Sequence, residues 1–176
     1  GGNIKGEGYA KLRFGFPVLD FSLTAKDVVL KPIENTKLFV DTSLSLSGKR
    51  LPYLLKGQLG IDGGSVESNL TSFQSKSKYL QAVTKYIKND FDGESDFIRT
   101  DIEVKSTKSI QLKNRLADML LNTDFKVLGT INSPILDGEI TVVPDISKFK
   151  FKGNEFVIKN GRIILSDGTS SDSVVL

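Results

Sequence analysis

Residues 124–165 alternate between apolar and polar side chains, with a break at Gly or Pro every few positions. Within each run every second residue is apolar, as at Phe125 and Val127 or at Phe149 and Phe151. A period of two places successive side chains on opposite faces of a β-strand. The breaks are turn residues, so this stretch predicts five or six short strands joined by tight turns. They fall at Gly129, Pro134, Gly138, Pro144, Gly153 and Gly161.

The two faces of these strands differ in chemistry. One face is apolar throughout, whereas the other is polar and mainly basic. A sheet of this kind turns its apolar face toward a core, a ligand or a partner. The polar face carries Lys126, Glu139, Thr141, Lys148, Lys150, Lys152, Lys159 and Arg162.

The joint spacing of turn and apolar residues in the last third of the chain resembles the C-terminal domain of the TamB family. TamB is the inner-membrane-anchored component of the translocation and assembly module of Gram-negative bacteria and is related to the AsmA-like proteins. Before that third, only the general pattern is similar. The matching positions are Leu128, Gly129, Thr130, Pro134, Gly138 and Ile140, then Phe149, Phe151, Gly153, Phe156, Ile158, Gly161 and Ile163.

The resemblance implies a fold and a location. Domains of this family are expected to form an elongated, curled sheet with an apolar concave interior, a β-taco-like groove. On this basis residues 1–176 are one mainly β domain of many short strands with one amphipathic helix. The resemblance further implies a fragment of a longer protein, the periplasmic segment of an inner-membrane-anchored chain in a Gram-negative envelope.

An internal repeat relates residues 37–61 to residues 118–142. A shift of 81 positions superimposes their glycine and apolar residues without a gap, so that Leu44 aligns with Phe125 and Gly57 with Gly138, and only Pro52 slips by one position against Pro134. A unit that repeats both its turns and its apolar face indicates a sheet extended by addition of similar hairpins.

Two segments depart from the period of two. In residues 76–90 the apolar side chains recur at intervals of three and four, which predicts an amphipathic helix. Such a helix either packs on the sheet or lies on a membrane surface. Residues 116–121 are helical by propensity, but their place before the repeat favours a bend into a strand.

Composition excludes several classes of function. The chain has no His and no Cys, which removes Ser-His-Asp and Cys-His nucleophile systems and nearly all zinc sites. Residues 90–96 resemble part of a calcium loop but lack its third regular ligand and distal Glu. A net charge of +3, with scattered basic residues, does not indicate nucleic-acid binding. We therefore expect no enzyme, cofactor or metal.

The apolar face is the candidate site. The sheet could close as a barrel, pack as a sandwich or remain a groove. The resemblance implies that such a groove would carry phospholipid acyl chains between the inner and outer membranes. Alternatively, a free sheet edge would bind unfolded outer-membrane protein strands, or a barrel of the BamA/TamA type, by strand addition. The expected groove residues are Leu38, Val40, Leu44, Leu46, Leu59, Ile61, Ile102, Val104, Leu112, Phe125, Val127, Ile131, Ile140, Val142, Phe149, Phe151, Phe156, Ile158, Ile163 and Leu165.

Overall fold

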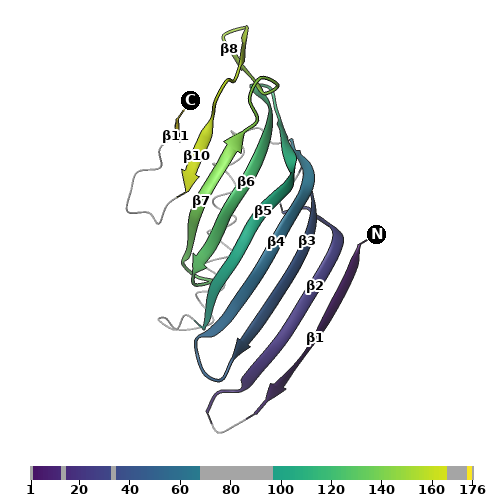
Figure 1. Ribbon diagram of the computed structural model, residues 1–176, viewed down its shortest axis with the longest axis vertical. Helices are drawn as coiled ribbons and strands as arrows, with labels where there is room; N and C mark the ends of the chain where they lie inside the picture. The colour runs from purple at the N-terminus through teal and green to yellow at the C-terminus, as the bar shows by residue number, and fades with distance from the viewer. Residues whose placement is uncertain (1, 13–14, 33–34, 68–96, 166–173, 176) are drawn as a thin grey trace.

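The computed structural model describes residues 2–12, 15–32, 35–67, 97–165 and 174–175. There the chain forms one open, curled sheet (Figure 1), which confirms the mainly β prediction. The described part has no helix, and therefore none long and apolar enough to cross a membrane. The predicted helix at 76–90 and the acidic loop at 90–96 lie outside the described residues.

Long strands come first in the chain and short ones follow. The first seven have 9 to 16 residues, longer than the many short strands that the sequence predicts. The strands are β1 Asn3–Lys11, β2 Val18–Leu30, β3 Thr36–Gly48, β4 Tyr53–Val66, β5 Ile98–Lys113, β6 Ala117–Gly129, β7 Pro134–Val142, β8 Lys148–Phe151, β9 Asn154–Val157, β10 Arg162–Leu165 and β11 Val174–Val175.

Strands that are consecutive in sequence are mostly neighbours in the sheet. The order is β1-β2-β3-β4-β5-β6-β7-β10-β11, and β8 pairs with β6 and β9 beside this path. Every pair is antiparallel except β4–β5, which is parallel. A parallel pair requires a crossover of a dozen or more residues, and the chain between β4 and β5 supplies that length. Alternation carries no information about strand direction, so the sequence does not predict this pair.

Register shifts occur inside two of the long strands. The register shifts within 25–28 of β2 and within 105–110 of β5. In β2 one extra residue reverses the alternation without ending the strand, whereas in β5 Val104 and Ile110 stay on the same face across the shift. At the β2 bulge the backbone N–H of Asp27 donates to Asp41 Oδ1 at 2.7 Å, which satisfies a group that the ladder leaves unpaired.

The β8–β9 hairpin extends the sheet where β7 leaves β6. β6 begins at Ala117, so residues 116–121 enter a strand, as their place before the repeat favours, and Ala117 lies opposite Phe149 of β8. Lys152 and Gly153 close the hairpin with φ of 49° and 83°, the positive values that a type I′ turn needs. Figure 1 shows β8 projecting beyond the ends of β7 and β10.

The two segments of the internal repeat form hairpins β3–β4 and β6–β7 with the same register. Leu44 lies opposite Gly57, and 81 positions later Phe125 lies opposite Gly138. In both hairpins a glycine faces a large apolar side chain across the strands. The other equivalent pairs are Leu46–Leu55 with Val127–Leu136, Thr42–Leu59 with Thr123–Ile140, and Val40–Ile61 with Leu121–Val142.

Candidate functional site

Cross-strand pairing carries the apolar alternation from strand to strand on one side of the sheet. Leu23 lies opposite Leu44, which lies opposite Gly57, which pairs with Ile102. Directly opposed residues point to the same face, and we call this side the apolar face. Of the residues predicted to line a groove it holds Leu38, Val40, Leu44, Leu46, Leu59, Ile61, Ile102, Val104, Leu112, Phe125, Val127, Ile140, Val142, Ile163 and Leu165.

Three predicted groove residues lie on the β8–β9 hairpin. Phe149 is half-buried and faces Phe156, and its ring stacks on that of Phe151 with 6.5 Å between centroids. Through the pairing of Phe149 with Ala117 these rings continue the apolar face past the end of β7. Phe151 and Phe156 are 54% and 51% exposed, so they do not belong to a closed core.

Two other predicted groove residues lie outside the strands. Ile131 is in the β6–β7 turn and is exposed. Alternation continues through this turn, but Thr130 and Ser133 already exchange backbone hydrogen bonds of 3.2 Å there. Ile158 follows the end of β9, and its backbone forms hydrogen bonds with Asp145 and Ser147 in the turn before β8. Their periodic position in the sequence therefore does not place them on a strand.

The middle of the apolar face is packed. Val40, Ile61, Val104 and Ile110, from β3, β4 and β5, form a cluster in which each residue is at most 8% exposed. Burial of such a side chain contributes about 1.5–3 kcal/mol, so this cluster stabilises the curled sheet. Partly buried neighbours from the same face pack around it: Val28, Leu38, Leu59, Val66, Ile102, Phe125 and Val127.

Toward β1 the apolar face opens into a hollow of about 520 Å³. Phe21 and Leu23 of β2 are each 40% exposed there. Opposite them β1 has Gly8 and Gly6, which bring no side chain where the neighbouring strands bring large ones. The glycines therefore leave Phe21 and Leu23 without a facing side chain on β1 beside the hollow. It is lined by Gly6, Glu7, Gly8, Phe21, Ser22, Leu23, Leu44, Leu46 and Leu55.

The predicted groove set omits Phe21, Leu23 and Leu55. Alternation over residues 19–25 indicates a strand and is the signal that would have found the first two. The hollow itself depends on which residue of β1 faces which residue of β2, because small and large side chains must be opposed. Pattern within one strand does not contain that register.

The apolar face offers hydrophobic contact rather than acid–base chemistry. The shifted carboxyl pKa values in the described residues belong to exposed ion pairs. A hydrogen bond from Lys108, 2.8 Å from Nζ to Oδ2, lowers the pKa of Asp62, and one from Lys148 lowers the pKa of Glu155. Among the described residues no three acidic side chains gather as metal ligands would.

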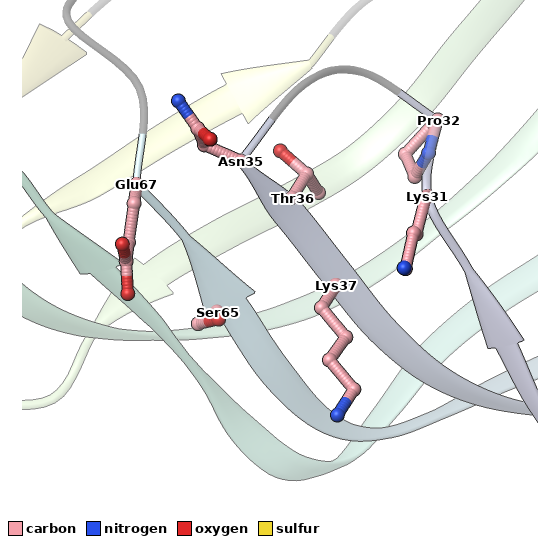
Figure 2. A pocket seen from close by; sticks show the side chains of 7 residues that line it. All are labelled: Lys31, Pro32, Asn35, Thr36, Lys37, Ser65 and Glu67. Atoms are coloured by element: carbon pink, nitrogen blue, oxygen red, sulfur yellow. The ribbon is translucent and has the colours of Figure 1, made fainter.

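A second hollow, of about 660 Å³, lies where β2 and β4 end and β3 begins (Figure 2). Its lining residues are polar or charged except Pro32, and Glu67 N–H donates to Asn35 O at 2.7 Å. Figure 2 shows the charged groups of Lys31, Lys37 and Glu67 well separated, without a common point of convergence. Because all three are exposed, solvent screens them, and we assign no site to this hollow.

Comparison with known families identifies the chain. The TamB C-terminal domain model matches residues 1–172, so the chain belongs to this family, and the likeness seen in its last third extends over nearly its whole length. Proteins of the family belong to the Gram-negative envelope, act in its translocation and assembly, and are not an enzyme family. No curated protein and no solved structure matches the chain.

Proposed function

We propose that this member of the TamB family binds phospholipid acyl chains on the apolar face of its sheet and carries them between the inner and outer membranes. The observation that supports this most directly is the hollow beside β1. It combines exposed Phe21 and Leu23 with a strand that contributes only glycine opposite them. Large apolar side chains left in water favour a ligand or a partner.

An acyl chain suits the hollow because it needs only apolar contact. Each methylene group removed from water contributes about 0.8 kcal/mol. Leu44, Leu46 and Leu55 supply such contact along adjoining strands. The charged head group would stay in water, so no specific polar anchor is required.

A pair of neighbouring substitutions on opposite faces tests this proposal. Leu23 lies on the apolar face, and Thr24 lies next to it on the polar face, opposite Ser43. Because Leu23 is already 40% exposed, a carboxylate in Leu23→Glu can be hydrated and the fold is retained. We expect Leu23→Glu to weaken binding of a fluorescent fatty acid about tenfold or more, since the lost contact is worth roughly 1.5–3 kcal/mol.

Thr24→Glu is the control and should bind like the unmodified protein. Thermal melting measured beside binding shows whether both variants fold. Equal fatty-acid binding by a folded Leu23→Glu variant would contradict the proposal, and so would an equal loss in Thr24→Glu.

The exposed edge of the sheet supports a second function. All nine residues of β1 are exposed, and among the described strands β1 pairs only with β2. An edge of this kind can accept another strand through its backbone groups. The chain would then assist assembly of outer-membrane proteins, with a barrel of the BamA/TamA type or an unfolded barrel strand as its partner.

Cargo analysis separates the two functions. Purified protein is extracted with organic solvent, and the extract is examined by mass spectrometry for phospholipid. In parallel, an unfolded outer-membrane strand peptide is tested for protection from proteolysis by lipid-free protein. Phospholipid without peptide protection supports lipid transport, whereas peptide protection without lipid supports strand addition.

A further inference from the structure

The β8–β9 hairpin exposes aromatic rings at the end of the sheet. Phe151 and Phe156 are about half exposed although they lie on the face that elsewhere forms the core. Phe149 joins them to β6 through Ala117, so the apolar face runs without a break onto the hairpin. Figure 1 shows this hairpin projecting past its neighbours. The apolar face therefore ends in rings that meet water.

Basic side chains lie on the other face of the hairpin and at its turn. Residues 113–118 and 148–157 carry five basic and two acidic side chains. The two segments are neighbours, because Lys150 N–H donates to Leu116 O at 2.6 Å. Lys148 and Lys150 pair with Glu155 at 2.7 and 3.8 Å, and Lys152 Nζ lies 5.4 Å from the centre of the Phe151 ring. The hairpin thus keeps a positive charge beside its exposed rings.

We propose that the β8–β9 hairpin docks end-on on an anionic lipid bilayer, with Phe151 and Phe156 of one face in the interfacial region and the lysines of the other face and of the turn against lipid phosphates. Apolar groups beside Lys and Arg give the combination of insertion and charge attraction used by interfacial segments. The net positive charge of these two segments fits a surface of many equivalent negative groups.

The position of the hairpin connects this docking with lipid transport, and that connection rests on the proposed function. A lipid chain lying along the apolar face would reach Phe149 and then the bilayer without crossing a polar surface. The docking itself does not require transport. The two ideas can therefore fail separately.

The test is flotation of the whole chain with vesicles of phosphatidylcholine containing about a third phosphatidylglycerol, a fraction that gives a strong negative surface potential. We expect binding to these vesicles, weaker binding to pure phosphatidylcholine and weaker binding at high salt. Phe151→Ser should reduce binding about tenfold, the loss expected for one inserted ring. Its exposure means that folding is retained, which melting will verify.

Phe39→Ser is the matched control. Phe39 is also exposed and also has a lysine ammonium, that of Lys37, 4.9 Å from its ring centre, but it lies on the polar side of β3. We expect this variant to bind vesicles normally. Absence of binding by the unmodified protein would overturn the proposal and leave the hairpin as a surface for a protein partner. Equal losses in the two variants would overturn it as well.

Fatty-acid binding in the same samples separates this proposal from the proposed function. Phe151→Ser should retain fatty-acid binding, because the hollow near β1 is unchanged. If the unmodified protein binds vesicles but no fatty acid, the proposed transport is wrong and the docking surface stands.

Discussion

Hairpins β3–β4 and β6–β7 have the same register but different surroundings. In both, an apolar pair closes the repeat, Val40–Ile61 in the first and Leu121–Val142 in the second. Val40 and Ile61 are 2% and 6% exposed, whereas Leu121 and Val142 are only partly buried. The repeated sequence thus sets which residues oppose one another without setting how deeply they are buried.

The neighbouring strands account for this difference. β3–β4 lies between two long strands, β2 and β5, whose side chains cover it from both sides. β7 has β6 on one side, and on the other it pairs with β10 at only four positions. Burial on a curled sheet therefore depends on the position of a hairpin among its neighbours. Substitutions at equivalent sites in the two hairpins test this dependence.

Truncation of the buried pair should give the largest effect. Ile61→Ala should lower the free energy of unfolding by about 2–5 kcal/mol, the range for such truncations in a packed core. Val142→Ala should lower it by about 1 kcal/mol, because the site is partly exposed and fewer methylene groups are lost. Urea unfolding of the two variants measures both values. Equal costs would show that the two hairpins contribute equally to the core.

Alanine at the repeated glycines should have the next largest effect. Gly57 and Gly138 have φ of 150° and 141°, and a Cβ at either would overlap a backbone carbonyl of the facing strand. We expect Gly57→Ala to cost about 1–3 kcal/mol. Gly138→Ala should cost less, since β7 is held by fewer neighbours and can shift.

Gly60→Ala is the control for this pair. A Cβ at Gly60 would lie 3.6 Å from Asp41 O, an ordinary contact. The free energy of unfolding of Gly60→Ala should therefore differ little from that of the unmodified protein. If Gly60→Ala is as costly as Gly57→Ala, the loss arises from glycine content in β4 rather than from the opposed carbonyl.

The ion pairs should give the smallest effect. Hydrogen bonds from Lys108 and then Thr107 lower the pKa of Asp62, so its stabilisation is present above the ordinary carboxyl pKa and is lost as pH falls through the lower, folded-state pKa. Asp62→Asn should therefore have a slightly lower melting temperature than the unmodified protein at pH 7. Well below the ordinary carboxyl pKa of about 3.9, the two melting temperatures should be equal.

Glu155→Gln in the hairpin is the corresponding change at the other end of the sheet. Lys148 lowers the pKa of Glu155 in the same way, but among the described strands the β8–β9 hairpin pairs with the rest of the sheet only at β6. Its effect on the main melting transition should be smaller still. For either variant, a difference in melting temperature from the unmodified protein that widens on acidification would contradict a lowered carboxyl pKa.

The sequence predicted faces better than it predicted connections. Period-two alternation placed Leu44 and Phe125 on one side of the sheet, because that period is a property of the strand itself. Residues 105–109 of β5 are all polar, so apolar alternation does not show that this strand is continuous. Alternation also assigned Ile131 to the groove, although Ile131 lies in the β6–β7 turn. The hollow depends on Gly6 and Gly8 facing Leu23 and Phe21, a relation between strands that no single run contains.

Photo-crosslinking at adjacent positions of β3 tests most directly whether the apolar face carries lipid. Benzoylphenylalanine is placed at Leu44, which lines the hollow, or at Ser43, which lies on the opposite face. After irradiation in cells, adducts are identified by mass spectrometry of the purified protein. We predict phospholipid adducts at position 44 and none at position 43. Absence of lipid at position 44, or equal labelling at both positions, would contradict the assignment of the apolar face as a lipid-binding surface.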